Sequence, residues 1–274
     1  MANTSQDRPH LQRWLTAAVA LPLLVALVAV GPDWLVTILV VVVTTLGLLE
    51  LARLLLPEAP VGVRLLLASG GILLPLATYW LGPTGLTGAA VAFLFLSILP
   101  FLFHASMDRE ILRSLGAMAF AQLYVPFAFS HLLLILRLPS GRRWIFLVLA
   151  VIFAGDTGAF YSGRLWGRHR LAPVLSPKKT VEGAVGGLMA SLAMTVLAGK
   201  LLNPAPLKVV ALLFLGLGLA LVGQLGDLME SMIKRASRVK DAGALLPGHG
   251  GMLDRLDSLL FAVPLTYYVA FFLI

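Results

Sequence analysis

Acidic residues near the C-terminus of the chain are spaced in a way that suits the binding of a metal ion and of phosphates. Four polar residues recur at i, i+3, i+4 and i+7 and so share one face of a helix: Asp227, Glu230, Ser231 and Lys234. Asp254 and Asp257 follow a glycine-rich segment and lie one helical turn apart. Mg²⁺ is usually bound through one or two carboxylates together with substrate phosphates. We therefore predict Asp227, Asp254 and Asp257 as metal ligands.

Basic residues and glycines surround these acids. The basic ones are Lys234, Arg235, Lys240 and Arg255. An arginine guanidinium can hydrogen-bond two phosphate oxygens at once, whereas lysine offers a compact positive charge. Glycines such as Gly250 and Gly251 let the backbone approach a ligand closely, so we assign both to substrate binding. Acids and bases in this combination suit phosphoryl or nucleotidyl transfer, because catalysis there rests mainly on positioning and charge neutralisation.

A second polar segment lies upstream, between residues 155 and 183. It supplies six candidate substrate-binding residues, which are Asp156, Ser176, Lys178, Lys179, Thr180 and Glu182. Asp156 lies within an apolar stretch, where an ionisable residue indicates a functional site. Two simpler interpretations stay open: segment 176–180 as an anchor for lipid headgroups, and Gly183 and Gly187 as a surface for helix packing. The two lysines would hold either a lipid headgroup or a triphosphate.

The rest of the chain is too apolar for a soluble protein. Of its 274 residues, 59% are hydrophobic and only 12% are charged, against about 25% charged in soluble domains. We therefore predict a polytopic integral membrane protein, all-α because a spanning segment must satisfy its own backbone polar groups. Hydrophobic stretches indicate about nine transmembrane helices, near residues 14–30, 34–56, 63–81, 85–103, 115–136, 143–162, 181–200, 206–229 and 256–274. Glu50 lies within the second, either buried and functional or turned towards the membrane surface.

The distribution of charge orients these helices. With nine spans, 16 of the 21 Lys and Arg residues fall on the side of the N-terminus, so the positive-inside rule places that side in the cytoplasm. Two long loops on this side, 163–182 and 230–257, would form a polar active-site cavity that faces the cytoplasm. Residues 1–110 would contribute about four helices and residues 111–274 the catalytic region. The net charge of +8 suits anionic lipid headgroups, so we expect no nucleic-acid partner.

The run SMIKRASRVKDAGALLPGHGGMLDRLD, from Ser231 to Asp257, resembles the signature of the phosphatidate cytidylyltransferases, also called CDP-diacylglycerol synthases. The upstream segments DTGAFYSGRLWGRHRLAP and SPKKTVEG are similar to a second block of that family. The resemblance covers most of the chain, is strongest from Phe153 onward and is faint before residue 110. Together with the acid upstream of the signature, its polar members are our catalytic candidates: Asp227, Ser231, Lys234, Arg235, Lys240, Asp241, His249, Asp254, Arg255 and Asp257.

This resemblance implies a reaction of phospholipid biosynthesis in which CTP and phosphatidic acid give CDP-diacylglycerol and pyrophosphate, with Mg²⁺ required. It also implies an all-helical homodimer with about nine transmembrane helices, which we expect in the inner membrane of a bacterium. In the family a pair of cations, Mg²⁺ with K⁺, lies near the acids that match Asp227 and Asp254. Ser231 and Lys234 match residues near the same centre. His249 would carry a proton, order its loop or donate a hydrogen bond to a phosphate.

Three other functions compete with this interpretation. A transferase that moves a group from a CDP-alcohol would carry the pattern DGxxARxxxxxSxxGxxxDxxxD, which is absent from the chain. A CTP-dependent membrane lipid alcohol kinase would also join CTP to a membrane substrate. A cation-coupled transporter would place its site near the membrane midplane, between two related halves of the chain. Here the charges gather at one face and no repeat is visible, which favours an enzyme.

Overall fold

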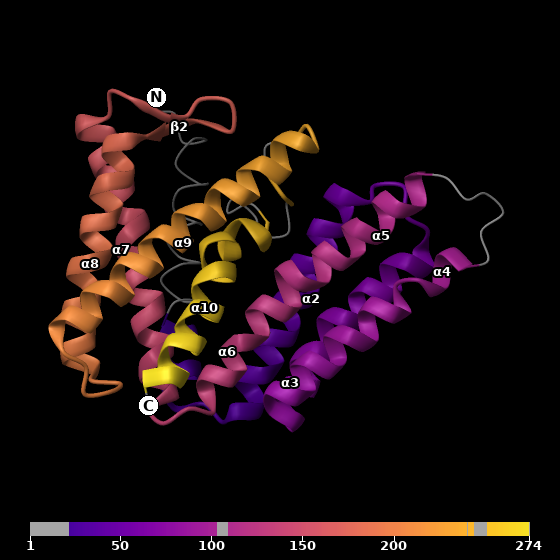
Figure 1. The fold of residues 1–274 in the computed structure, drawn as a ribbon, viewed down its shortest axis with the longest axis horizontal. Coiled ribbons are helices and arrows are strands. Elements are labelled where there is room, and N and C mark those ends of the chain that lie inside the picture. The colour runs from indigo at the N-terminus through magenta and orange to yellow at the C-terminus, as the bar shows by residue number, and fades with distance from the viewer. Residues whose placement is uncertain (1–21, 103–108, 240, 244–250, 274) are drawn as a thin grey trace, which may run out of the picture.

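The computed structural model describes residues 22–102, 109–239, 241–243 and 251–273. Residues 22–30 are helical, and the later helices are α2 (Asp33–Leu55), α3 (Val61–Leu96), α4 (Leu99–Leu102), α5 (Arg109–Gln122), the π-helix η1 (Leu123–Phe127), α6 (Ala128–Leu136), α7 (Gly141–Trp166), α8 (Val181–Leu202), α9 (Val209–Ala236) and α10 (Leu253–Leu273). Two short strands, β1 (Arg170–Ala172) and β2 (Ser176–Thr180), form an antiparallel hairpin. The hairpin sits at the end of the α7–α8 pair (Figure 1).

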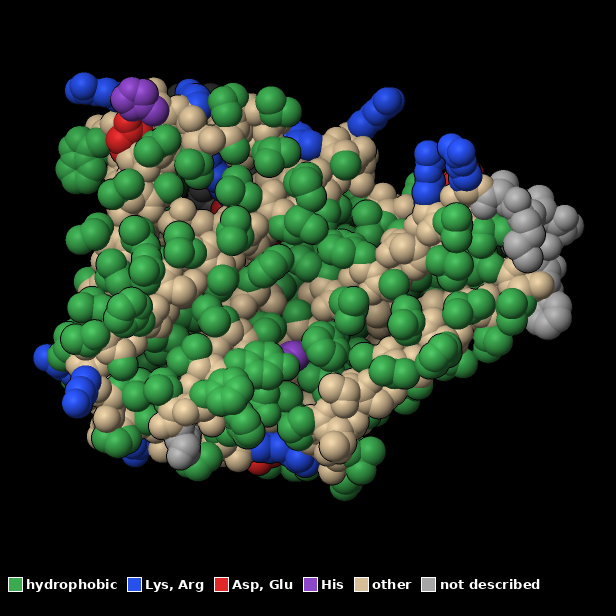
Figure 2. All heavy atoms as spheres, viewed as in Figure 1, with side chains coloured by type: hydrophobic (Ala, Val, Ile, Leu, Met, Phe, Trp, Pro, Cys, Tyr) green, Lys and Arg blue, Asp and Glu red, His purple; other side chains and the backbone are tan. Residues whose placement is uncertain are grey.

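The described helices have the length and surface of a membrane protein. Seven helical stretches among the described residues are long and apolar enough to cross a bilayer. Hydrophobic side chains cover the middle of the molecule in Figure 2, whereas Lys and Arg gather at its upper and lower edges. Such an apolar belt would be unfavourable in water but is solvated by lipid chains. The prediction of an all-α polytopic membrane protein is confirmed, with one small hairpin in addition.

The expected spans 63–81 and 85–103 are the two halves of one helical stretch, Val61–Leu102. A continuous helix of that length would measure about 63 Å, roughly twice the thickness of the hydrocarbon core. The backbone leaves the helical conformation at Gly82, with φ 66° and ψ −143°, a combination that glycine adopts readily. Arg137 donates hydrogen bonds to the carbonyls of Tyr79 and Trp80 just before this break. The expected span 14–30 is described only from residue 22, so the number nine stays a prediction.

Both expected cytoplasmic loops are shorter than the sequence indicated. The expectation of a loop from residue 163 was wrong because α7 continues to Trp166 and the hairpin occupies most of the connection to α8. The loop expected from residue 230 starts later because α9 continues to Ala236, which agrees with the helical face predicted from Asp227 to Lys234. This last turn of α9 keeps Ile233 buried, and its basic residues Lys234 and Arg235 complement the partial negative charge of a helix C-terminus.

Close packing of small residues joins α7 to α8. A Cβ atom added at Gly187 would lie 2.9 Å from the carbonyl oxygen of Gly155, and one added at Gly183 would lie 2.9 Å from that of Ala159. Thr180 caps α8, since its hydroxyl accepts a hydrogen bond of 3.1 Å from the N–H of Gly183. The structure therefore supports the interpretation of these two glycines as packing residues. Because the hairpin connects α7 to α8, this packing also determines where the hairpin lies at the end of the bundle.

Helix α10 joins the two sides of the molecule. It packs against α9 and α7 on one side and against α6 and α2 on the other, and Figure 1 shows it at the centre of the view between them. In its first turn Leu253 and Leu256 are buried, and the acids Asp254 and Asp257 belong to this end of the helix. Helices from both halves of the chain therefore pack against α10.

Candidate active site

A cavity of about 620 Å³ opens beside the hairpin, between α7, α8, α9 and α10. Eight of the residues that we predicted as binding, metal-ligating or catalytic line it: Asp156, Ser176, Lys178, Lys179, Thr180, Asp227, Asp254 and Asp257. They come from segments up to about one hundred residues apart in the chain. The two polar segments that the sequence singled out therefore border one cavity. Its remaining wall is largely apolar, with Ile152, Phe160, Leu171 and Leu219 among the lining residues.

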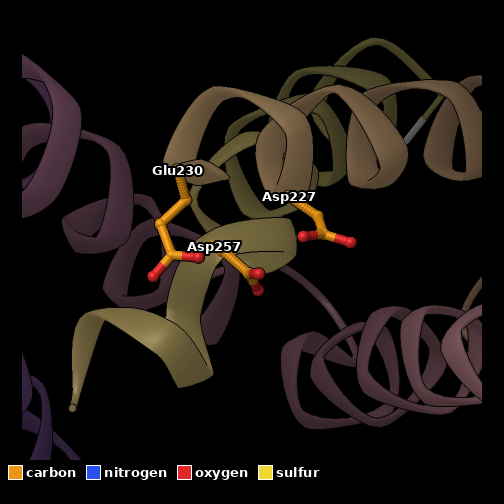
Figure 3. Close-up of side chains that lie close together, drawn as sticks. All are labelled: Asp227, Glu230 and Asp257. Carbon is orange, nitrogen blue, oxygen red and sulfur yellow. The ribbon is translucent and has the colours of Figure 1, made fainter. Parts of the chain in front are cut away.

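Three carboxylates converge at the side of this cavity formed by α9 and α10. Asp227, Glu230 and Asp257 each offer an oxygen, and these oxygens lie within 4.8 Å of one another. Figure 3 shows Asp227 and Glu230 on successive turns of α9, with the side chain of Asp257 from α10 between them. Glu230 is only 1% exposed, and its Oε1 has no hydrogen-bond partner among the described residues. One buried and two half-buried carboxylates that repel one another in this way suit a divalent cation.

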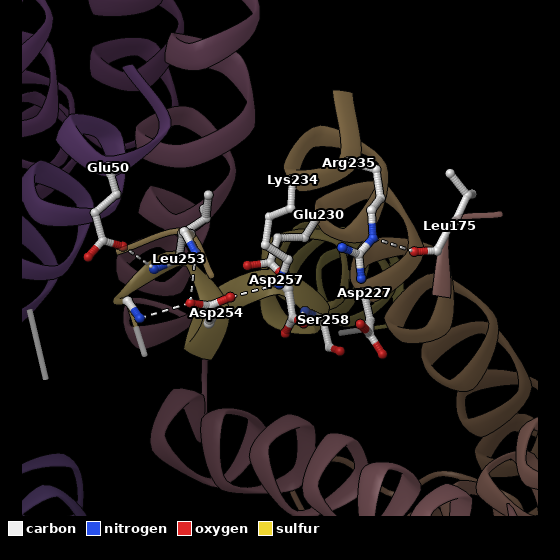
Figure 4. A network of polar contacts seen from close by, with 12 residues as sticks. Glu50, Leu175, Asp227, Glu230, Lys234, Arg235, Leu253, Asp254, Asp257 and Ser258 are labelled. Carbon is white, nitrogen blue, oxygen red and sulfur yellow. Dashed lines mark hydrogen bonds and ion pairs between the residues drawn. The ribbon is translucent and has the colours of Figure 1, made fainter. Parts of the chain in front are cut away.

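Lys234 links this acidic cluster to Asp254. Its Nζ lies 2.6 Å from Oε2 of Glu230 and 2.7 Å from Oδ1 of Asp254. The other oxygen of Asp254, Oδ2, accepts hydrogen bonds from the N–H groups of Gly251 at 2.8 Å and Ala242 at 3.1 Å. The network is drawn in Figure 4. Asp254 is thus held by a lysine and two backbone donors, next to the cluster rather than within it.

The hairpin brings basic residues to the same place. Nζ of Lys179, on β2, lies 2.5 Å from Oδ2 of Asp227. Arg235, one turn beyond the acids on α9, donates a hydrogen bond of 3.3 Å from Nε to the carbonyl of Leu175. The first contact places a positive charge at the acid cluster, and the second fastens the hairpin to α9. Lys178 and Lys179 line the cavity, whereas Arg235 does not.

Some predicted residues lie elsewhere. Glu182 accepts hydrogen bonds from Nδ1 of His169 at 2.6 Å and from the N–H of Arg168 at 3.0 Å, so it ties the base of the hairpin and does not line the cavity. Ser231 is half-buried on α9, Asp241 and Arg255 are exposed, and Gly251 is buried beside Asp254. Lys240, His249 and Gly250 lie outside the described residues.

Sequence reasoning left two acids out of the predicted site. Glu230 shares the helical face of Asp227 and Lys234, and this spacing was the signal that could have identified it. Glu50 lies on α2, far from the other acids in sequence, and is only 1% exposed. Its Oε2 accepts a hydrogen bond of 2.9 Å from the N–H of Leu253. No local pattern in the sequence indicates this contact.

Comparisons with known proteins agree with the geometry. The model of the cytidylyltransferase family matches residues 11–273. The phosphatidate cytidylyltransferase of Bacillus subtilis (strain 168) is 35% identical over 264 residues, which cover 94% of this chain and 96% of that protein. Phosphatidate cytidylyltransferases of Staphylococcus saprophyticus and Staphylococcus aureus (strain COL) are 48% and 47% identical over 126 residues, about half of each chain. The chain belongs to the cytidylyltransferase family.

Proposed function

We propose that the chain transfers the cytidylyl group of CTP to phosphatidate, giving CDP-diacylglycerol and pyrophosphate. The observation that carries this proposal is the cavity between α7, α8, α9 and α10, in which Asp227 and Asp257 of the acidic cluster, two lysines of the hairpin and an apolar wall meet. Charged groups suit the triphosphate and the lipid phosphate, and the apolar wall suits acyl chains. The names of the relatives agree with this activity.

In the reaction, an oxygen of the phosphatidate phosphate attacks the α-phosphorus of CTP. A new P–O bond forms, the bond to the β,γ-pyrophosphate breaks, and pyrophosphate leaves with the bonding electron pair. The ionised phosphomonoester is itself nucleophilic, so no strong general base is required. The main obstacle is repulsion between two anionic substrates, and basic side chains reduce it. Lys178 and Lys179 would bind phosphate at the hairpin side, and Lys234 and Arg235 would neutralise the leaving group.

A metal ion fits the acidic cluster. Asp227, Glu230 and Asp257 would hold it, because their oxygens lie within 4.8 Å of one another and one oxygen of Glu230 has no partner among the described residues. When bound, Mg²⁺ would neutralise the charge of the phosphates. Asp254 is close enough to the cluster, through Lys234, to serve a second cation, for which K⁺ is our candidate. Carboxylate and phosphate oxygens are the ligands that Mg²⁺ prefers.

The distribution of basic residues and the nature of the two substrates indicate how the protein is oriented in the membrane. We place the end of the bundle that holds the hairpin in the cytoplasm, where CTP is available, with the N-terminus on the same side. The protein would lie in the inner membrane of a bacterium and act as a homodimer. A cavity at the membrane surface lets a nucleotide enter from water while the acyl chains stay in the bilayer.

Purified protein in detergent, given labelled CTP, phosphatidic acid and Mg²⁺, tests the proposal. We expect labelled CDP-diacylglycerol and one pyrophosphate for each product molecule, and no product after the metal is removed with a chelator. Replacing phosphatidic acid by diacylglycerol distinguishes the lipid kinase, which would release CDP and form phosphatidate. Formation of CDP with diacylglycerol, or no reaction of CTP with either lipid, would overturn the proposal.

A further inference from the structure

Glu50 is a buried acid that the proposed reaction does not use. It lies on α2, 1% exposed, and it is not among the residues that line the cavity. A buried carboxylate is costly unless hydrogen-bond donors compensate it, and an ionisable residue in a spanning helix indicates a function. Among the described residues, Oε1 of Glu50 has no hydrogen-bond partner and Oε2 has one donor, so this single donor indicates what Glu50 does.

The carboxylate of Glu50 caps helix α10 from another helix. Its Oε2 accepts the N–H of Leu253 at 2.9 Å, a bond between residues 203 positions apart. Leu253 is the first residue of α10, and N–H groups in the first turn of a helix lack an acceptor within the helix. A negative charge at this end also interacts favourably with the helix dipole. Glu50 thus fixes where α10 begins.

Two glycines let the backbone close around this carboxylate. A Cβ atom added at Gly251 would lie 2.5 Å from Oε2 of Glu50 and 2.8 Å from the backbone nitrogen of Gly243. One added at Gly243 would lie 2.7 Å from Cδ of Glu50. Such distances leave no room for a methyl group on either side. The two glycines of the signature therefore serve the contact with Glu50.

The same backbone holds Asp254. Gly251 donates its N–H to Oδ2 of Asp254, as does Ala242, and Asp254 follows Leu253 directly. Figure 4 shows the path from Glu50 through Leu253 to Asp254 and on to Lys234, which pairs with Glu230. A shift of the turn at residues 251–253 would therefore move Asp254 and, through Lys234, disturb the acidic cluster.

We infer that Glu50 is a positioning residue for Asp254: it holds the first turn of α10 and thereby the carboxylate that pairs with Lys234. Glu50 does not line the cavity and acts through the backbone of residues 251–253. The inference rests on the proposed function, because it assigns Asp254 to the site that binds CTP. If Glu50 only stabilised the fold, its replacement would lower the stability of the protein but would leave the Kd for CTP of the folded protein unchanged.

Calorimetric measurement of the Kd for CTP, with Mg²⁺ present, tests the inference in detergent-solubilised full-length protein. Glu50→Met fills the volume but removes the acceptor, and we expect it to raise this Kd by about 10- to 100-fold, as for groups that orient metal ligands. Glu50→Gln keeps an oxygen that accepts the N–H of Leu253, so we expect a smaller increase. Glu58→Gln, an exposed acid just after α2, is the matched control and should bind CTP as the wild type does.

A double-mutant cycle separates positioning from a general loss of stability. If Glu50 acts through Asp254, Glu50→Met combined with Asp254→Asn binds CTP within about twofold of Asp254→Asn alone, because coupled residues are not additive. Wild-type affinity in Glu50→Met, or additive losses in the double variant, would overturn the inference. If Glu50→Met does not fold, Gly243→Ala takes its place; it presses on the same carboxylate, and wild-type affinity in this variant would equally overturn it. A wild-type protein that makes no CDP-diacylglycerol would instead overturn the proposed function.

Discussion

Lys234 holds two carboxylates of different helices at once, and this makes it central to the site at the residue scale. Its ammonium group pairs with Glu230 and Asp254 at 2.6 and 2.7 Å, while Glu230 is buried. The sequence placed Lys234 on the face of Asp227 because helical spacing is a local property. It could not show that Asp254 also pairs with Lys234 or that Asp257 lies beside Asp227 and Glu230, since the approach of α10 to α9 decides both.

We predict that Lys234→Met lowers both stability and activity. Removing one partner leaves two carboxylates facing each other without a counter-charge, which costs about 3–5 kcal/mol for a buried pair. The thermal unfolding midpoint in detergent should fall clearly, and CDP-diacylglycerol formation should be lost. Lys208→Met, at an exposed lysine before α9, is the control and should change neither. An unchanged midpoint for Lys234→Met would contradict the role of this lysine.

At the scale of elements, the helices were predictable and the hairpin was not. Apolar stretches long enough to span a bilayer identify helices because hydrocarbon leaves the backbone no alternative. The strands β1 and β2 have only three and five residues, and SPKKT shows no alternation of apolar and polar positions that would indicate a strand. The helical spacing from Asp227 to Lys234 agrees with α9, which continues to Ala236, whereas the loop expected from residue 230 began too early because these residues are polar. Tertiary contacts with α10 and with the hairpin keep this turn helical.

The packing of α7 against α8 makes a prediction at this scale. Gly187→Ala would bring a methyl carbon within 2.9 Å of the carbonyl oxygen of Gly155 and 3.0 Å of Cβ of Ala159, so the helices must separate. We expect a loss of about 1–3 kcal/mol in the free energy of unfolding and reduced activity, because α7 and the hairpin carry Asp156 and Lys179. Gly116→Ala has nothing within 4 Å of the added carbon and should be neutral or slightly stabilising. Equal effects of the two changes on the unfolding midpoint would contradict the packing role of Gly187.

At the scale of the whole molecule, the chain places charged chemistry at one end of an apolar bundle. Lys and Arg lie at both edges of the molecule and hydrophobic side chains between them (Figure 2). The composition was enough to predict a membrane protein, and the resemblance of the C-terminal segment identified the family. The boundary near residue 110 between an N-terminal and a catalytic region stays a prediction, and Glu50 contacts the catalytic segment from the N-terminal side.

The orientation in the membrane can be measured directly, because the chain contains no cysteine. We predict that Glu58→Cys reacts with a membrane-impermeant maleimide only after spheroplasts are permeabilised, since residue 58 would face the cytoplasm. Lys208→Cys, in the exposed connection between α8 and α9, should react in intact spheroplasts. The opposite pattern of labelling would reverse the orientation that the positive-inside rule gives.

The proposed function depends on the acidic cluster of Asp227, Glu230 and Asp257 being the place where nucleotidyl transfer occurs. Asp227→Asn keeps the size of the side chain but removes a charge that would hold the metal and that pairs with Lys179. The most direct test is the Mg²⁺-dependent rate of CDP-diacylglycerol formation by this variant, compared with Glu58→Gln and with the thermal unfolding midpoint of each protein. We predict a loss of at least about 100-fold in a folded protein, with Glu58→Gln unaffected. A folded Asp227→Asn protein with a near wild-type rate would contradict the assignment of this site.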